Sequence, residues 1–311
     1  MKKIWDTDKK SKKSINTDTV RDVLLVVSCV CFAVGMIILG KHYYDVLQVR
    51  RQTEELKEVR DQVSSGSVSE DLLAVSDDAA VPYDGAALKM MREMYAADGI
   101  VVDDKPGMLP EYEALYEQNP DICGWLYVEG TVIDYPVMQT PDDENYYLYR
   151  DFYKKNNANG SLIMDTDSVV GTGTAKRFYT DGTAPGTNLI IHGHHLIVNA
   201  MFGKLVRYEK EAYGREHSVI CFDSLYEKRK YELIAAFYTQ VYEKDADVFK
   251  YYEFFQADTE EEFNYFYDNI KKLSLYDTGV TAVYGDEFIT LSTCSYQTDT
   301  GRFVVIGKRI E

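Results

Sequence analysis

After Pro120 the chain becomes a succession of short β-type segments, and this succession limits its fold more strongly than any other feature. Runs rich in Val, Ile, Leu, Tyr and Phe alternate with Gly, Asn and Asp, which are typical of turns. Eight or nine short strands favour a closed antiparallel barrel or a sandwich, so we expect a mainly β domain. The expected strands are 124–128, 131–137, 160–165, 187–193, 218–223, 230–239, 279–284, 287–294 and 302–310.

Three helical patterns accompany the strands. Residues 86–97 and 110–119 look like two short helices, and Pro110 stands in a first helical turn, where proline is permitted. A later helix interrupts the strands, because Thr259 and Glu262 have the spacing of a capping box. Its inner stripe is expected to consist of Phe263, Phe266, Ile270 and Leu273.

The N-terminal part predicts a membrane anchor. Residues 23–40 carry no charge and approach the length that a helix needs to cross a bilayer. Residues 1–22 have a net charge of +3, which predicts a cytoplasmic N-terminus and an extracellular remainder. We favour an uncleaved signal-anchor over a cleaved signal peptide, because no A-x-A-like site follows and the apolar run is long for a signal peptide.

A helical stalk and a spacer are expected between the membrane and the folded domain. Residues 42–63 favour a helix in which Val49, Leu56 and Val63 recur at every seventh position, and a Ser-, Asp-, Ala- and Gly-rich segment follows. The predicted organisation is a basic cytoplasmic tip (1–22), a transmembrane segment (23–40), a stalk with spacer (41–85) and an extracellular domain (86–311).

The charge of the chain argues against one class of partner. The net charge is −17, so the part that follows the basic tip carries all of the negative excess. Phosphate binding needs clustered Lys and Arg, and we therefore expect no nucleic-acid partner.

Cysteine usage singles out one thiol. Cys29 and Cys31 lie in the apolar run, where they behave as small apolar residues. Three cysteines remain, so at least one stays free; Cys123 and Cys221 either pair or are two inert thiols. Cys294, directly behind a β-type run, is the thiol that calls for a chemical explanation.

Cys294 and Arg302 flank a polar loop with a Gly that suits a hairpin connection. Thiol and guanidinium would then stand at the same end of two adjacent antiparallel strands. A thiol attacks a carbonyl as the thiolate, which needs a histidine or a cation nearby, and a positive donor stabilises the oxyanion. With a histidine from His192, His194 or His195, the set predicts acyl transfer through a thioester.

Other interpretations of these residues are open at this point. A cysteine at a strand end is often a packing residue, and an arginine on an edge is often a solvated charge. Because side chains alternate between the two faces of a strand, His192 and His194 would lie on the same face, as a zinc site needs. However, no H-E-x-x-H or C-x-x-C spacing accompanies them, so we expect neither a metal nor a cofactor.

The sequence resembles the sortases, and most closely their class B. "TLSTC" (290–294) matches the family's TL-x-TC motif, "IIHGHH" (190–195) its strand that ends in Gly-His, and "GRFVVIGKRI" (301–310) its closing strand with the arginine. The segments "NPDICGWLYVEGTVIDYPVMQ", "YYLYRDF" and "NGSLIMD" match as well, so the resemblance covers residues 110–310.

The resemblance implies an eight-stranded sortase β-barrel, preceded by helices, with a helix-bearing insertion at about 242–279. It also implies catalytic roles for His194, Cys294 and Arg302. Ser292 is implied to contact the substrate, whereas Thr293 faces away and reads as core, with a substrate role left open. The remaining two histidines, His192 and His195, are expected to be supporting or solvent-exposed residues.

The function that the resemblance implies is a membrane-anchored cysteine transpeptidase on the outer face of a Gram-positive bacterium. Such an enzyme cleaves a C-terminal sorting signal of a secreted protein and transfers the acyl group to an amine of a cell-wall precursor or a pilin, in wall anchoring or pilus assembly. Two alternatives stay open: a cysteine endopeptidase that uses water as acceptor, and a non-catalytic binding or adhesion module on a stalk.

Overall fold

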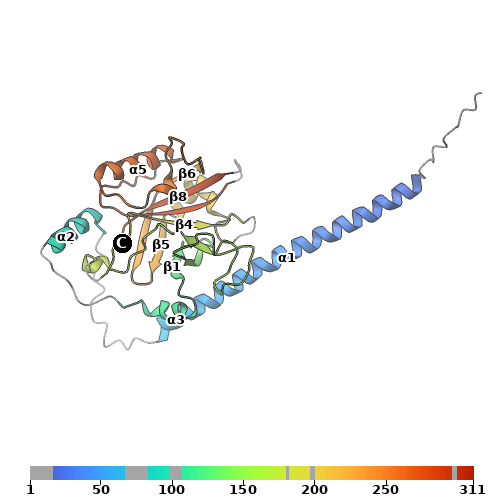
Figure 1. The fold of residues 1–311 in the computed structure, drawn as a ribbon, viewed down its shortest axis with the longest axis horizontal. Coiled ribbons are helices and arrows are strands. Elements are labelled where there is room, and N and C mark those ends of the chain that lie inside the picture. Colours follow the sequence, from blue (N-terminus) through green and yellow to red (C-terminus); the bar gives the residue numbers. More distant parts are fainter. Residues whose placement is uncertain (1–16, 67–82, 98–106, 180–181, 197–199, 296–299) are drawn as a thin grey trace, which may run out of the picture. The chain divides into compact units, whose positions relative to one another are not determined.

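The computed structural model describes residues 17–66, 83–97, 107–179, 182–196, 200–295 and 300–311 (Figure 1). Most of the expected basic tip and most of the expected spacer lie outside these residues. The chain divides into two compact units, Met1–Asp45 and Val46–Glu311, and every strand found in the described residues belongs to the second.

The second unit is built on a closed barrel, as the resemblance implied. Its strands follow the order β1-β2-β3-β4-β7-β8-β6-β5 around the barrel. Successive side chains of a strand point to opposite faces, so one face of each strand lines the barrel. β7 is buried on both faces up to Cys294, because a second cluster covers its outer face. Among the described residues the strands are β1 (Ile122–Tyr127), β2 (Asp134–Met138), β3 (Leu162–Met164), β4 (Asn188–Gly193), β5 (Val219–Ser224), β6 (Lys228–Gln240), β7 (Phe288–Cys294) and β8 (Gly301–Arg309).

The pairing around β7 places the end of the strand that carries Cys294. β4 runs parallel to β7 on one side, and β8 runs antiparallel to it on the other. Ile289 and Leu291 of β7 point into the barrel core, whereas Phe288 packs into a second cluster outside the barrel. The even-numbered side chains of β7, up to Cys294, therefore share the outer face of the sheet.

The expected strand at 279–284 is wrong, because this segment is irregular. Gly279 has a φ of +79°, a left-handed conformation that does not suit a strand. The backbone N–H of Val280 donates to the Thr278 hydroxyl, and that of Val283 donates to the Asp286 carboxylate. Side chains satisfy these donors locally, so the segment needs no neighbouring strand.

The helices agree with the predicted patterns. α2 (Gly85–Ala97) and α3 (Pro110–Gln118) lie where two short helices were expected. The connection between β6 and β7 carries a 3-10 turn, η3 (Tyr251–Glu253), and α5 (Glu260–Leu273), which lies against the outside of the barrel near β6 and β8 (Figure 1). The other short helices are η1 (Ala175–Arg177), η2 (Leu205–Glu209) and α4 (Glu211–Glu216).

The capping box of α5 is confirmed, since Thr259 accepts from the N–H of Glu262 and the Glu262 side chain accepts from the N–H of Thr259. Phe263, Phe266 and Ile270 are fully buried against the outer face of the barrel. The expected fourth member of the stripe is wrong: Leu273 is 40% exposed, because the helix ends there and turns away at Ser274.

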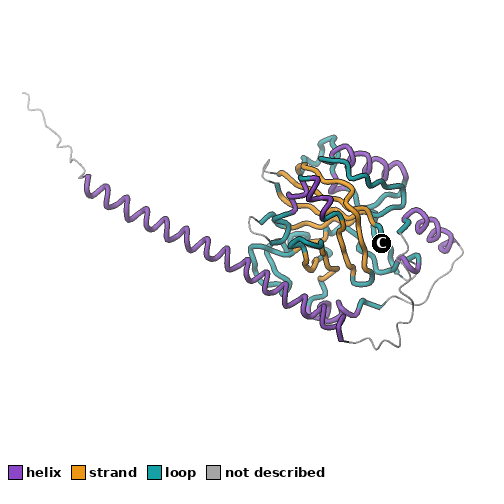
Figure 2. Tube along the Cα trace, turned by 180° about the vertical axis from the view of Figure 1, so that it is seen from behind, coloured by secondary structure: helices purple, strands orange, loops and turns teal. Residues whose placement is uncertain are grey.

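The first helix, α1 (Thr17–Gly66), includes both the apolar run and the expected stalk. Its residues 21–62 form a helix that is long and apolar enough to cross a membrane, by length and composition. From Val46 onward, however, the helix belongs to the barrel unit (Figure 2). We expected residues 41–85 to stand apart from the domain as stalk and spacer, yet Val49 and Leu56 are buried in the clusters of that unit.

Leu56→Ala is expected to lower the free energy of unfolding of the barrel unit by about 2–5 kcal/mol. Leu56 is 1% exposed and shares a cluster with Tyr112 of α3 and Trp125 of β1, so its removal leaves a cavity. Denaturant unfolding of the full chain in detergent measures this change. Glu58→Ala, an exposed position on the same helix, is the control and should change the value by less than about 0.5 kcal/mol. Equal effects would show that the helix does not pack on the barrel.

Candidate active site

Two adjacent strands, β4 and β7, end at the predicted site, and β8 begins there. Gly193, the last residue of β4, lies opposite Thr293 of β7, so His194 leaves β4 beside the end of β7. Cys294, the last residue of β7, lies directly opposite Arg302 of β8. Directly paired residues point to the same face of a sheet, so the thiol and the guanidinium share the outer face at this end of the barrel.

The thiol of Cys294 differs from the thiols of the other barrel cysteines. Cys294 is exposed, whereas Cys123 and Cys221 are partly covered and are free thiols in the structure, not a disulfide. Burial raises the pKa of the Cys123 thiol strongly and also raises the pKa of Cys221. Both therefore stay protonated at neutral pH, and Cys294 is the exposed thiol among the three cysteines of this unit.

His194 is held by the segment that follows β2. Its Nε2 lies 2.7 Å from the carbonyl oxygen of Leu148, and a carbonyl only accepts, so Nε2 carries a proton. The ring of Tyr149 lies 5.8 Å from the imidazole, centroid to centroid. This arrangement fixes the ring and leaves Nδ1 as the nitrogen available for proton exchange.

His195 supports the nucleophile from its backbone side. Its Nδ1 donates to the carbonyl oxygen of Cys294 over 2.8 Å. The expectation from sequence was a supporting or solvent-exposed residue, and the structure gives a contact to the end of β7 that no motif indicated. The other expected supporting residue, His192, bonds to Asp165 and not to Cys294.

A tyrosine that sequence reasoning missed reaches the site from the insertion between β6 and β7. The hydroxyl of Tyr251 lies 2.7 Å from Oγ of Ser292, and both side chains are almost completely buried. Burial raises the pKa of Tyr251 to about 12, whereas its hydrogen bond with Ser292 and the charge of Arg302 lower it. Because Ser292 belongs to the outer face of β7, this hydrogen bond places the insertion over that face.

Ser292 and Thr293 fix β7 on its two faces. Ser292 lies under Tyr251, so its contact with a substrate stays a prediction. Thr293 is 2% exposed and its hydroxyl donates to the Gly193 carbonyl over 2.7 Å, which ties β7 to β4 on the core side. Its expected core position agrees with this burial, and a substrate role for it is untested.

Arg302 is half-buried at the start of β8. Its Nη1 donates to the carbonyl oxygen of Gly301 over 3.0 Å and lies 3.4 Å from that of Thr300. These contacts hold the head group near its own strand end, at the level of Cys294. A guanidinium there is suited to an oxyanion or to a peptide carbonyl.

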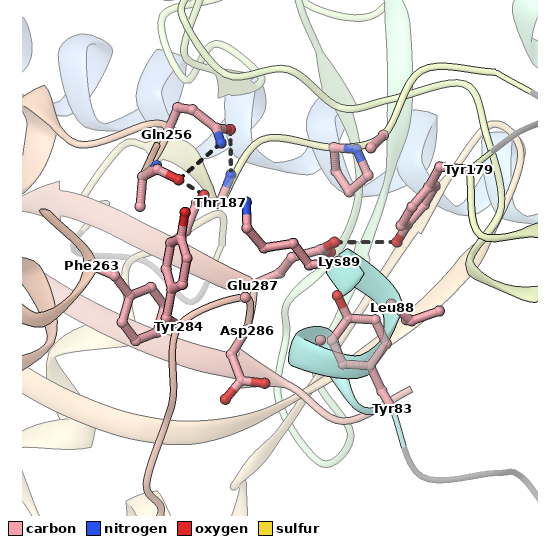
Figure 3. Close-up of a pocket in the computed structure, with 15 residues that line it drawn as sticks. Tyr83, Leu88, Lys89, Tyr179, Thr187, Gln256, Phe263, Tyr284, Asp286 and Glu287 are labelled. Carbon is pink, nitrogen blue, oxygen red and sulfur yellow. Dashed lines mark hydrogen bonds between the residues drawn. The ribbon is translucent and has the colours of Figure 1, made fainter. Parts of the chain in front are cut away.

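A polar pocket lies at the opposite end of β7 and does not belong to this site (Figure 3). It is lined in part by Tyr83, Lys89, Tyr179 and Glu287. The Tyr179 hydroxyl donates to Glu287 over 3.2 Å, and the buried Arg309 donates to the same carboxylate over 2.8 Å. Because Glu287 precedes the first residue of β7, this cluster closes the far end of the barrel.

Together, the thiol, imidazole and guanidinium at one strand-end region suit acyl transfer. A thiolate forms a thioester with a carbonyl carbon, an imidazole donates a proton to the departing amine, and a guanidinium stabilises negative charge on oxygen. The other clusters described above contribute structural contacts.

Comparison with known proteins gives relatives of one kind. A sortase B of Staphylococcus aureus is 31% identical over 204 residues, which cover 65% of this chain and 75% of that protein. A sortase B of Listeria monocytogenes is 28% identical over 221 residues, 70% of this chain and 82% of that protein. A solved Staphylococcus aureus sortase B–substrate complex superposes with a TM-score of 0.55 at 27% identity and covers 73% of this chain and 93% of that one.

No family model matches the chain. The pairwise matches nevertheless cover 65–73% of the chain, and the matched structures are of sortase B. Identity of 31% across three quarters of a sortase B, joined to this closed barrel, shows that the chain belongs to class B of the sortase family.

Proposed function

We propose that this chain is a membrane-anchored cysteine transpeptidase that acts on a sorting signal near the C-terminus of secreted proteins. The observation that carries the proposal is the direct pairing of Cys294 with Arg302, beside the strand from which His194 leaves. The similarity of the chain to sortase B supports the same proposal. A related sortase B has been solved with a substrate, which supports a peptide as the partner here.

The first half of the reaction cleaves the signal. The Cys294 thiolate attacks the carbonyl carbon of the scissile peptide bond, and the negative charge moves to the carbonyl oxygen, near Arg302. When the tetrahedral intermediate collapses, the C–N bond breaks and the leaving amine takes a proton from His194. The N-terminal part of the signal is then held as a thioester on Cys294.

The second half transfers the acyl group to an amine. The deprotonated His194 accepts a proton from the incoming amine, whose nitrogen attacks the thioester carbonyl and releases the Cys294 thiolate. The contact between Leu148 and Nε2 of His194 keeps the ring in one orientation through both proton transfers. An amine of a cell-wall precursor or of a pilin fits the acceptor role.

The membrane anchor forms part of the proposal. The apolar first part of α1 holds the enzyme at the bilayer, with the N-terminus in the cytoplasm and the barrel outside. Secreted substrates and lipid-linked acceptors at the bilayer share that surface with the enzyme. Confinement to one plane raises their effective concentration.

The acceptor distinguishes transfer from hydrolysis. With a sorting-signal peptide alone, the chain is expected to release the C-terminal fragment slowly; added amine should convert the N-terminal product to the ligated form. Liquid chromatography with mass spectrometry measures the ratio of ligated to hydrolysed product. A ratio that does not rise with amine concentration would favour the alternative, a cysteine endopeptidase with water as acceptor.

A further inference from the structure

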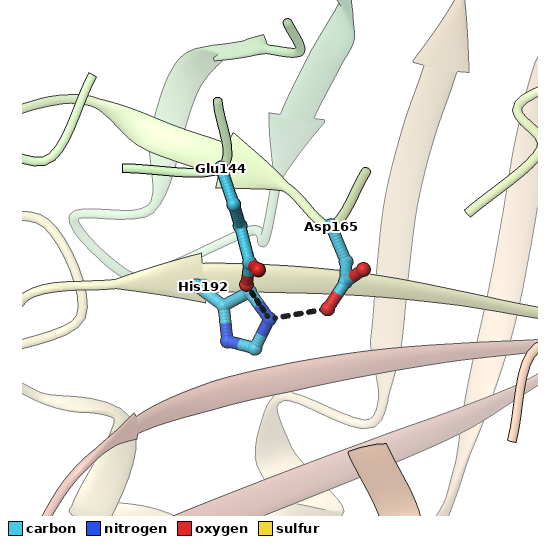
Figure 4. Close-up of side chains that lie close together, drawn as sticks. All are labelled: Glu144, Asp165 and His192. Atoms are coloured by element: carbon cyan, nitrogen blue, oxygen red, sulfur yellow. Dashed lines mark hydrogen bonds and ion pairs between the residues drawn. The ribbon is translucent and has the colours of Figure 1, made fainter. Parts of the chain in front are cut away.

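Three metal-ligand groups converge on one face of β4, two residues before His194 (Figure 4). Nε2 of His192 lies 3.1 Å from Oδ2 of Asp165 and 3.7 Å from Oε1 of Glu144. The ligand atoms of all three residues lie within 4.8 Å of one another. They come from β4, from the end of β3 and from the loop after β2, so the fold alone brings them together.

A simple ion pair does not account for this arrangement. A single ring nitrogen carries at most one proton, which Asp165 is better placed to accept than Glu144. Among the described residues Glu144 has no hydrogen-bond donor, although its carboxylate faces that of Asp165. Two carboxylates and one imidazole nitrogen therefore converge, and a shared cation would bind all three.

Two of the three ligands are rigidly placed before any ion arrives. His192 lies inside the sheet, opposite Ile163 of β3 and Ser292 of β7. Asp165 is 6% exposed, its N–H donates to the Ile190 carbonyl, and its Oδ1 accepts from the N–H of Asp167. The second oxygen of Asp165 is therefore directed at the imidazole. Glu144, which is exposed, supplies the third ligand from the loop after β2.

We propose that Glu144, Asp165 and His192 bind a divalent transition-metal cation of the zinc type, with solvent as the fourth ligand. Tetrahedral zinc with bonds of about 2.0–2.1 Å to nitrogen and oxygen separates its ligand atoms by about 3.3 Å. The separations of 3.1 Å and 3.7 Å from the imidazole nitrogen bracket this value. Two carboxylates and a neutral imidazole also match the charge of a divalent ion.

The cation site is a further site, separate from the proposed catalytic residues. It is connected to His194 through the chain segment 144–148. Glu144 stands four residues before Leu148, whose carbonyl holds the His194 ring. A cation bound between Glu144 and β4 therefore ties this segment to the strand from which His194 leaves. Metal occupancy would hold the Leu148 carbonyl in place and so position the imidazole.

Isothermal titration of the tag-free full chain in detergent tests the site. Because the Cys294 thiolate itself binds zinc, the titrations use the Cys294→Ala background. We expect one Zn²⁺ per chain, and Glu144→Gln, Asp165→Asn and His192→Gln each to weaken binding by at least about 100-fold, since even outer-shell changes cost 10–100-fold. Asp142→Asn, an exposed acid in the same loop, should stay within about twofold of the parent.

The preference of the site for one metal ion over others provides a second measurement. Ca²⁺ and Mg²⁺ prefer all-oxygen sites, so both should bind at least about tenfold more weakly than Zn²⁺. Three results would overturn the proposal: no Zn²⁺ binding up to millimolar concentration, binding that survives His192→Gln or Glu144→Gln, and equal affinity for Ca²⁺ and Zn²⁺. Glu144 is exposed, so its variant reports on the site even where the Asp165 variant fails to fold.

Discussion

Cys294→Ala is expected to abolish cleavage of a sorting-signal peptide, with turnover reduced by at least about 10⁴-fold. The alanine removes the atom that forms the thioester, and no described neighbour offers another accessible thiol. The fold should survive, because Cys294 is exposed and exposed substitutions change stability by less than about 0.5 kcal/mol. Chromatography of the released C-terminal fragment and the unfolding midpoint of the same sample measure the two quantities.

Cys221→Ala is the matched control for this variant. Cys221 is a half-buried free thiol of β5 whose pKa is raised by burial, and its removal should leave turnover within about twofold of the parent. If Cys294→Ala cleaved peptide at the parent rate, or if the parent chain bound its partner without cleaving any peptide, the stalked binding or adhesion module would become the better description.

Arg302→Ala is expected to lower kcat/KM by about 10²–10³-fold, the loss typical of one donor to an oxyanion. Arg302 pairs with Cys294 across β7 and β8, and it also acts on the buried hydroxyl of Tyr251. Arg302→Lys should recover little of this loss, because an ammonium lacks the planar fork of donors that a guanidinium offers. Steady-state kinetics with one peptide over a range of concentrations measure both variants.

Arg215→Lys controls for a general effect of removing a guanidinium. Arg215 is an exposed residue of α4 that pairs with Glu211, so its replacement should leave kcat/KM unchanged within about twofold. If Arg302→Lys were as active as the parent, a positive charge at this position would be sufficient. If Arg302→Ala were equally active, Arg302 would have no part in the reaction.

Much of the barrel was predictable because its strands are encoded locally. The short β-rich runs and the turn residues between them located all eight strands of the described residues, and the Thr259–Glu262 spacing located α5. The errors occur where tertiary contacts decide. The segment 279–284 has the composition of a strand, but Thr278 and Asp286 satisfy its backbone donors.

The packing of α1 was also beyond the sequence pattern. Its heptad-like repeat is the same for a free stalk and for a helix that covers a barrel, and only the position of Trp125 and Tyr112 in space makes the difference. An ion pair also joins α1 to the barrel: Nζ of Lys57 lies 2.8 Å from Oδ2 of Asp134 at the start of β2. No local sequence pattern predicts this contact.

The candidate site divides in the same way. Cys294, Arg302 and His194 stand in or beside strands with recognisable motifs, and β pairing explains why they meet. The residues that surround them come from loops distant in sequence and have no motif: Tyr251 reaches Ser292, and Leu148 holds His194. A buried tyrosine hydroxyl needs a partner, but the sequence does not say which one.

The intact mass of the full chain, incubated with a sorting-signal peptide and no amine, is the most direct measurement of the covalent step. Thioester formation predicts an increase equal to the mass of the N-terminal peptide fragment, located on Cys294 by peptide mapping and removed by hydroxylamine. A chain that releases the C-terminal fragment at full rate but never carries this adduct, even when quenched within the first turnover, would contradict catalysis through Cys294.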